Sequence, residues 1–320
     1  MDQPERLTAV VPPELAGLRL DQALAEMFPD YSRARLQRWI RDGQVQVDAR
    51  GLRARDKVHG GETVQIDVVA TPEDRWEPES IPLDLVYEDE HILVIAKPAG
   101  LVVHPAVGNR AGTLLNALLH YAPELAAVPR AGIVHRLDKD TSGLLVVART
   151  LVAQNRLVEQ LQARAFLREY QAIVNGVLPA GGTVDAPIGR HPVHRKRMAV
   201  TERGKPAKTH YRVVERYRVH SLLKVSLETG RTHQIRVHMA HIRCPILGDP
   251  VYGGRMRIPP QCGEALRACL QGFRRQALHA IRLGLEHPVS GEPMEWSQPL
   301  PDDMAELVVL LRADARQEYK

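Results

Sequence analysis

The sequence predicts an α+β protein of two domains, and three observations lead to this prediction. The chain has 320 residues, a length at which polypeptides usually divide into two domains. An acidic, proline-containing stretch separates a basic N-terminal part from the remainder. Beyond that stretch, short apolar runs typical of strands alternate with segments of helical periodicity. With 44% hydrophobic and 25% charged residues, the chain can build sizeable cores, and disorder is excluded as the overall class.

Charge and proline content divide the chain into four expected segments. Residues 71–90 carry eight acidic side chains against Arg75 alone, with three prolines among them. Such a stretch is typical of an interdomain linker. We therefore expect an N-terminal extension over 1–16, a small domain over 17–70, an acidic linker over 71–82 and a large domain over 83–320.

Composition also excludes several classes of protein. The apolar runs are far shorter than the roughly 18 residues that a membrane span needs, and residues 1–6 do not begin a signal peptide. The three cysteines are odd in number and form no CxxC pair, so neither a zinc ribbon nor a secreted disulfide framework fits. We expect a cytoplasmic protein without membrane contact.

The small domain is predicted to contain two helices followed by short strands. Residues 18–25 favour a short helix, and Ser32 stands where an N-cap belongs before a second helix over 33–42. The second helix carries a stripe of large apolar side chains. Valine and isoleucine then alternate at period two, which predicts strands around 45–47 and 64–68.

Basic side chains gather on and after the second of these helices. Between residues 31 and 57 there are eight Lys or Arg against three acidic residues, a balance that points to a polyanionic partner. A helix pair carrying arginines beside a small hairpin resembles the S4, or αL-type, RNA-binding module. That resemblance implies contacts to the phosphate backbone of structured RNA. The residues expected to make them are Arg33, Arg35, Arg38, Arg41, Arg53 and Lys57.

The large domain is predicted to combine strands with helices. Apolar runs at 92–96 and 144–148 predict strands, whereas residues 152–164 and 232–242 favour helices. A second basic region, 190–218, holds ten Lys or Arg against two acidic residues and again points to a polyanion.

The most informative segment is 132–143, with the sequence GIVHRLDKDTSG. Asp and Lys are seldom buried unpaired, so this loop is either a solvated turn or a site whose charges are neutralised by partners. Residues 140–143 resemble an aspartic protease loop, but the second copy that such a mechanism requires is not found in the chain. The histidines here and at 233–241 lack metal-ligand spacing, so we expect no metal.

Three segments, in the right order, resemble the signature motifs of the RluA family of pseudouridine synthases. They are Arg136-Leu137-Asp138 in this loop, Arg168-Glu169-Tyr170 opening a strand, and residues 230–238, with the sequence GRTHQIRVH. The match extends to 97–105 and 248–254 and covers most of the chain from residue 81 onward. The resemblance implies a catalytic domain with a mixed, mostly antiparallel sheet flanked by helices. Further segments are most similar to a branch of the family that begins with an S4 module and acts on ribosomal large-subunit RNA.

The resemblance implies roles for individual side chains. Isomerisation of uridine to pseudouridine breaks the N1–C1′ bond and rejoins the base through C5, so a carboxylate is needed where the sugar develops positive charge. Asp138 matches that family position, Arg236 matches its salt-bridge partner, and Tyr170 matches the aromatic residue against the base. Arg136 matches the residue that fills the space left by the flipped uridine. The remaining positions expected to contact RNA are Arg231 and His233, for which capping of the helix that they open is an equal alternative.

The function implied by the resemblance is pseudouridine formation in 23S rRNA, at uridines of the helix 69 hairpin loop. The partner is then large-subunit rRNA or a pre-ribosomal particle, and we expect a monomer. The reaction needs no redox step, and the chain has no GxGxxG or GxxxxGK[ST] run, so no cofactor or nucleotide is expected. The competing function is a non-enzymatic rRNA-binding ribosome assembly factor, which has no need of Asp138, Tyr170 and Arg236 together.

Overall fold

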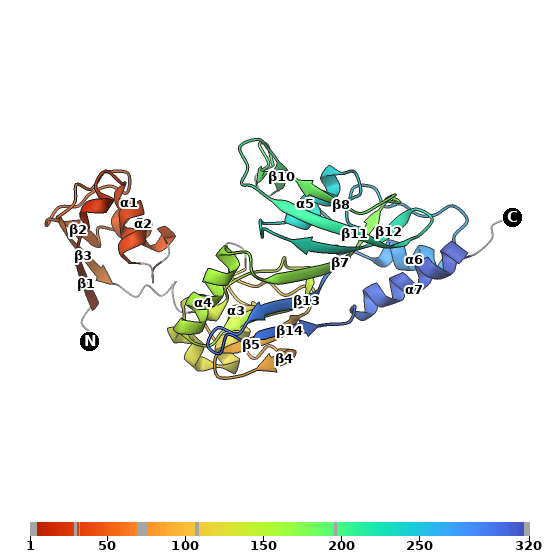
Figure 1. Cartoon of the computed structure of the whole chain (residues 1–320), viewed down its shortest axis with the longest axis horizontal. Helices are drawn as coiled ribbons and strands as arrows, with labels where there is room; N and C mark the ends of the chain where they lie inside the picture. Colours follow the sequence, from red (N-terminus) through yellow and green to blue (C-terminus); the bar gives the residue numbers. More distant parts are fainter. Residues whose placement is uncertain are drawn as a thin grey trace. The chain divides into compact units, whose positions relative to one another are not determined.

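The computed structural model in Figure 1 describes most of the chain. The described residues are 5–28, 31, 33–68, 76–105, 109–194 and 197–316. The chain divides into two compact units, Met1–Trp76 and Glu77–Lys320, each with its own hydrophobic core. The division falls inside the expected linker over 71–82, of which residues 71–75 lie outside the described residues.

The N-terminal unit contains a three-stranded antiparallel sheet, in the order β1-β3-β2, and two helices. Its elements are β1 (Glu5–Val10), the 3-10 turn η1 (Pro13–Leu15), α1 (Leu20–Met27), α2 (Arg33–Arg41), β2 (Val45–Val47) and β3 (Thr63–Val68). The two predicted helices and two predicted strands are present, and the predicted N-cap Ser32 lies outside the described residues. Strand β1 lies in the segment expected as an N-terminal extension, and it pairs with β3 along its whole length.

A buried carboxylate ties the two helices of this unit together. Asp21 of α1 has a fully buried side chain and accepts hydrogen bonds from Arg33 Nη2 at 2.6 Å and from Arg19 Nε at 3.0 Å. Burial acts to raise the pKa of Asp21, but the hydrogen bonds from Arg33, Gln37 and Arg19 lower it overall. The first arginine of α2 is therefore engaged within the unit.

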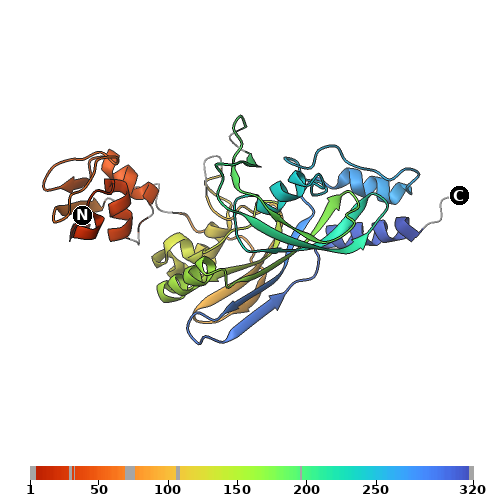
Figure 2. The same cartoon turned by 45° about the horizontal axis from the view of Figure 1, so that its top comes forward.

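A nine-stranded mixed sheet forms the centre of the C-terminal unit. The strand order is β4-β5-β6-β13-β7-β12-β11-β8, with β14 paired to β13 beside this path, and β6 and β13 are its one parallel pair among the described residues. Strands from both ends of this unit, drawn orange and blue, lie side by side in Figures 1 and 2. The strands are β4 (Leu85–Glu88), β5 (Ile92–Lys97), β6 (Ser142–Ala148), β7 (Leu167–Asn175), β8 (Gly182–Asp185), β11 (Lys208–Arg216), β12 (His220–Leu227), β13 (Leu278–Glu286) and β14 (Pro293–Ser297), and a separate pair is formed by β9 (Ile188–Arg190) and β10 (Met198–Val200).

Strands β5 and β6 are buried on both faces. In β5, Ile92 and Val94 belong to the core that includes residues of α4 (Leu151–Gln162), whereas Leu93 and Ile95 belong to the core that includes α3 (Leu114–Tyr121). Both faces of these strands therefore need apolar side chains, which explains why the sequence shows unbroken apolar runs rather than alternation.

The remaining helices are α5 (Gln234–His241), α6 (Glu264–Gly272) and α7 (Asp302–Arg316), with 3-10 turns η3 (Pro123–Ala127) and η4 (Pro129–Gly132). The helices predicted at 152–164 and 232–242 correspond to α4 and α5. Helix α5 begins later than predicted because His233 has a φ of 57° and lies outside the helix.

The predicted α+β class and the mixed, mostly antiparallel sheet are confirmed. Among the helices of the described ranges, none is both long and apolar enough to cross a membrane.

Candidate active site

A cavity of about 520 Å³ lies in the C-terminal unit and is lined by stretches far apart in the sequence. Its lining comes mainly from residues 134–141, from α4 and the start of β7, and from residues 227–236. The three motifs distinguished in the sequence therefore meet at one place. All six residues expected to act in this domain line the cavity, namely Arg136, Asp138, Tyr170, Arg231, His233 and Arg236.

A buried lysine holds the loop that carries Asp138. Lys97, at the end of β5 and 1% exposed, donates a hydrogen bond to the backbone carbonyl of Lys139 at 2.9 Å. Its two other acceptors are also backbone carbonyls. Burial lowers the pKa of Lys97 to about 7, although Asp140 and Asp138 act to raise it. Lys97 thus ties the loop to β5.

The other end of this loop leads into β6, at a position that requires glycine. Gly143 has a φ of 113°, and a Cβ there would lie 2.3 Å from the carbonyl oxygen of Ala280 on β13. Only glycine allows this close approach of the two strands. Thr141 Oγ1 also accepts a hydrogen bond from Gln276 Nε2 at 3.0 Å. The loop is therefore fixed against β13 and the segment before it.

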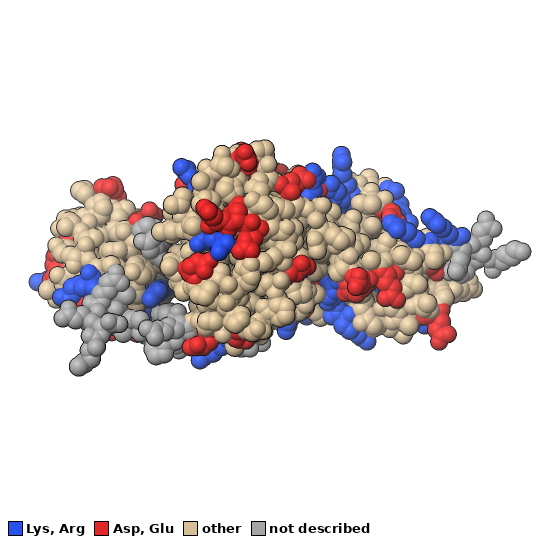
Figure 3. Space-filling view, turned by 90° about the horizontal axis from the view of Figure 1, so that it is seen from below, with Lys and Arg blue, Asp and Glu red and all other residues tan. Residues whose placement is uncertain are grey.

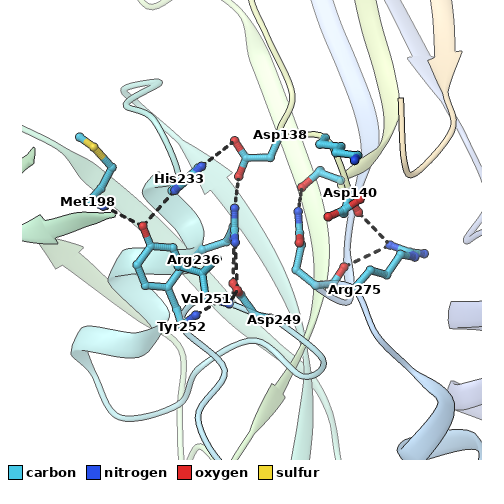
Figure 4. A network of polar contacts seen from close by, with 12 residues as sticks. Asp138, Asp140, Met198, His233, Arg236, Asp249, Val251, Tyr252 and Arg275 are labelled. Atoms are coloured by element: carbon cyan, nitrogen blue, oxygen red, sulfur yellow. Dashed lines mark hydrogen bonds and ion pairs between the residues drawn. The ribbon is translucent and has the colours of Figure 1, made fainter. Parts of the chain in front are cut away.

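Asp138 and Asp249 share one arginine (Figure 4). Arg236, on α5, donates from Nη1 to Asp138 Oδ2 at 2.9 Å, and from Nε and Nη2 to the two carboxylate oxygens of Asp249 at 2.7 and 2.9 Å. The side chain of Asp249 is fully buried, whereas that of Asp138 is 16% exposed. A single guanidinium thus bridges a buried carboxylate and a carboxylate that opens to the cavity.

The pKa shifts within this group of Asp138, Arg236 and Asp249 keep Arg236 and Asp249 charged. Burial acts to lower the pKa of Arg236, but the two carboxylates raise it above its usual value. Burial acts to raise the pKa of Asp249, but Arg236 and the backbone N–H groups of Tyr252 and Val251 lower it overall. Asp249 is therefore an anion that fixes the position of Arg236.

His233 lies on the other side of Asp138. Its Nε2 is 3.8 Å from Asp138 Oδ1, which is longer than a hydrogen bond, and its Nδ1 is 2.9 Å from the Tyr252 hydroxyl. Because that hydroxyl accepts from the backbone N–H of Met198 at 2.8 Å, its own proton is available to Nδ1, which leaves the imidazole proton on Nε2. Burial lowers the pKa of His233 and Asp138 opposes this, so the ring is neutral at neutral pH.

Tyr170 supplies an aromatic wall. It lies on β7 opposite Val225 of β12 and Ala280 of β13, and it is 7% exposed. Burial raises the pKa of Tyr170, Arg168 acts to lower it and Asp138 acts to raise it. The phenol is therefore protonated at neutral pH, so in the resting protein it can donate a proton but not accept one.

Arg136 and Arg231 differ in how they are held. Arg231 Nε donates to the backbone carbonyl of Pro206 at 3.0 Å. The side chain of Arg136 is exposed, and no hydrogen bond or ion pair holds it in the part of the chain that the structure describes. Arg136 is therefore free to meet a substrate.

The expected RNA-binding residues of the N-terminal unit also differ in their surroundings. Arg33 is paired within the unit, and the Arg35 guanidinium lies 4.8 Å from the ring centre of Trp39. Arg38 is exposed. Three further side chains are exposed and make no hydrogen bond or ion pair with any described residue, namely Arg41, Arg53 and Lys57. These three are the most available to a polyanion.

Charge on the surface is mixed, as the net charge of +5 from 43 basic and 38 acidic residues suggests. On the face drawn in Figure 3, the coloured Lys and Arg side chains form small groups among Asp and Glu. Attraction of this face to RNA would therefore depend on local groups of cations rather than on a uniform basic surface.

Two residues that complete the site, Asp249 and Tyr252, were given no role by the sequence analysis. Both lie in the segment 248–254, which carried part of the family resemblance. A carboxylate inside a run rich in glycine was the available signal, but sequence spacing cannot show that it binds Arg236. No group of three or more His, Cys, Asp or Glu side chains is placed to hold a metal ion among the described residues.

Comparison with known proteins gives matches for both units. Residues 91–241 match the family described as RNA pseudouridylate synthase, and residues 18–64 match the S4 domain. A relative from Escherichia coli O6:H1 (strain CFT073) is 60% identical over 321 residues, covering all of this chain and 98% of the relative. A relative from Pseudomonas aeruginosa is 59% identical over 306 residues, covering 96% of each chain. Both relatives are named ribosomal large subunit pseudouridine synthase D.

A solved structure agrees with the fold of the C-terminal unit. The human protein RNA Pseudouridylate Synthase Domain Containing 4 has a TM-score of 0.56 and 27% sequence identity. The similarity covers 72% of this chain and 93% of the human chain.

Proposed function

The chain belongs to the RNA pseudouridylate synthase family, and from this premise we propose that it isomerises uridine in the helix 69 hairpin loop of 23S ribosomal RNA. The observation that carries this proposal is the Asp138 carboxylate, turned toward a cavity by Arg236, which Asp249 anchors. The name shared by the relatives supports large-subunit rRNA as the substrate. The choice of the helix 69 loop as the target within that rRNA rests on the resemblance to that branch of the family.

Asp138 acts at C1′ of the uridine. When the N1–C1′ bond breaks, its electron pair leaves with the uracil, and the carboxylate attacks or stabilises the electron-poor sugar carbon. The base then turns, and C5 attacks C1′. C5 loses its proton and N1 gains one, so the reaction is an isomerisation that needs no redox partner.

Tyr170 packs against the base while it turns. Because its phenol is protonated at neutral pH, it is not ready to take the C5 proton in the resting protein. Its first role is therefore to confine the base within the cavity, and any transfer from C5 requires the phenol to give up its proton beforehand.

The substrate assignment is tested by mapping pseudouridines in 23S rRNA from a strain that lacks this protein. We expect the uridines of the helix 69 loop to be unmodified in that strain and modified again when the gene is restored. If those uridines stay modified and others lose modification, the enzyme class stands and the target is wrong. If no site changes and the purified protein modifies no rRNA or pre-ribosomal particle, the non-enzymatic assembly factor becomes the better account.

Arg136→Ala is expected to slow isomerisation more than it weakens RNA binding. The target base is stacked within RNA and must be flipped out, and Arg136 is an unheld cation two residues from Asp138. Losing the side chain that fills the vacated space raises the free energy of holding the base out by a few kcal/mol. RNA with a pre-extruded uridine should restore the rate of the variant, which rapid-quench kinetics would measure. A variant equally impaired on that RNA would show that Arg136 serves chemistry or folding instead.

Replacing Arg41, Arg53 and Lys57 together with glutamine should weaken RNA binding and reduce its salt dependence. These side chains are exposed and unpaired among the described residues, so each can release counterions when it meets a phosphate. The slope of log affinity against log salt concentration should fall by about 2 to 3, at 0.7 to 0.9 per lost contact. Arg156→Gln is the control, because Arg156 is exposed and already paired with Glu159. An unchanged slope in the triple variant would contradict the assignment.

A further inference from the structure

Arg168 is a cation in the cavity that the mechanism above leaves unused. It precedes Tyr170 by two residues on β7, so both side chains leave the same face of the strand, and both line the cavity. Its side chain makes no hydrogen bond or ion pair with any described residue, and its Nε is buried without a partner. Unsatisfied buried donors are rare and destabilising, so this one requires an explanation.

The other buried or half-buried arginines that line the cavity already have partners. Arg236 binds Asp138 and Asp249, and Arg231 donates to a backbone carbonyl. Arg164, which is more exposed, pairs with Glu228 at 3.3 Å. Among these cavity-lining arginines, Arg168 combines a buried donor with the absence of a partner, and that combination is suited to a ligand that is itself an acceptor.

The segment that follows β12, the strand paired with β7, leaves space for this guanidinium. A Cβ added at Gly230 would lie 2.9 Å from Arg168 Nη1. Gly230 also lines the cavity, in the motif that carries Arg236. Glycine at this position therefore lets the guanidinium lie beside the backbone, where any larger side chain would displace it.

Arg168 lies on the same side of the cavity as Tyr170, against which the base is expected to pack, because the two side chains leave the same face of β7. Its charge acts on the pKa of Tyr170 and, after burial, on the pKa of His135. The face of β7 that carries Tyr170 therefore also presents an unpaired guanidinium to the cavity, whereas the guanidinium that binds Asp138, that of Arg236, is fully paired.

We propose that Arg168 donates hydrogen bonds to the departing uracil and stabilises the negative charge that the base acquires. This rests on the proposed roles of Asp138 at C1′ and Tyr170 against the base. When N1–C1′ breaks, the bonding pair stays on the base and spreads over N1, O2 and O4, while C1′ bonds to the Asp138 carboxylate or remains electron-poor beside it. Attack by C5 on C1′ releases the carboxylate, C5 gives up its proton and N1 takes one, so atoms and electrons balance. A preorganised guanidinium in a site that excludes water is effective against such developing charge.

The inference is tested with Arg168→Met, which keeps an unbranched apolar side chain in place of the aliphatic stem but removes the charged guanidinium. We expect the single-turnover rate constant for C5 tritium release to fall about 100-fold, with little change in the Kd for RNA measured separately. Arg168→Lys should retain part of the rate, because an ammonium keeps the charge without the planar fork. The matched control is Arg282→Met on the neighbouring strand β13, because Arg282 pairs with Glu169 and Glu295 and does not line the cavity. Thermal melting identifies any variant that is unfolded, in which case Arg168→Lys provides the test.

RNA carrying 5-fluorouridine at the target makes the test specific to the base. Fluorine stabilises the base anion, so Arg168→Met should slow N1–C1′ cleavage much less in this RNA than in RNA with uridine. Cleavage is measured by digesting the RNA and separating the nucleosides by chromatography. An equal loss on both RNAs would overturn the inference and assign Arg168 to positioning. A raised Kd with an unchanged rate would overturn it in favour of an RNA phosphate contact. Inactivity of the unmutated protein would instead overturn the proposed function, on which the inference depends.

Discussion

Replacement of Asp138 by asparagine is expected to abolish pseudouridine formation while the protein stays folded and still binds rRNA. Asparagine preserves the shape of the side chain, but its carboxamide oxygen is a poor nucleophile and carries no charge to meet C1′. We expect a loss of at least about 1000-fold, equivalent to roughly 4 kcal/mol of transition-state stabilisation. Release of tritium from uridine labelled at C5 measures the loss, because that hydrogen leaves only when the new bond forms.

The structure limits how much Asp138→Asn should affect stability. Arg236 keeps its two hydrogen bonds to Asp249 when Asp138 is neutralised, so we expect the free energy of unfolding to fall by only about 1 to 2 kcal/mol. Asp140→Asn is the matched control, because Asp140 lies in the same loop and its carboxylate accepts no hydrogen bond from any described residue. It should retain turnover. Substantial tritium release from folded Asp138→Asn protein would contradict the mechanism.

The sequence was sufficient to predict the fold class and the family because the decisive patterns are local or occur in a fixed order. The buried strands β5 and β6 appear as unbroken apolar runs, and α2 appears as an apolar stripe that ends before Gly43. The family prediction depended on motifs and is confirmed by relatives that match along the whole chain. Strand β1 was not predicted, because its pairing partner β3 lies about 60 residues away and its own sequence shows no clear alternation.

The site was predictable only as far as the motifs extended. They identified Asp138, Tyr170 and Arg236, which the structure brings to one cavity. The motifs did not reveal that Arg236 serves two carboxylates, because Asp249 reaches it from a loop 13 residues further along the chain. Nor could they show that the Arg168 donor is buried without a partner, since burial depends on the folded cavity. Sequence spacing does not determine which side chains form hydrogen bonds and ion pairs with one another in the site.

Asp249→Asn is expected to reduce both stability and turnover, although Asp249 does not itself line the cavity. The carboxylate is fully buried and holds two nitrogens of Arg236, so neutralising it leaves a buried guanidinium with Asp138 as its remaining anion. Removing one partner of such a pair typically costs about 3 to 5 kcal/mol. A displaced Arg236 also misplaces Asp138, and a shift near 1 Å can cost about 100-fold in rate.

A matched ion pair and a pH series together test the prediction for Asp249. Asp303→Asn is the control, because Asp303 holds Arg275 through the same two-nitrogen contact but is 46% exposed, and such exposed pairs contribute only about 0 to 1 kcal/mol. The folded protein lowers the pKa of Asp249, so its contribution to stability is complete above the unfolded carboxyl pKa of about 4 and is lost as the pH falls through the folded value. The difference in Tm between the unmutated protein and Asp249→Asn should therefore narrow as the pH is lowered below about 4. A difference no larger than that of Asp303→Asn at neutral pH, together with normal turnover, would show that Arg236 holds its position without this buried carboxylate.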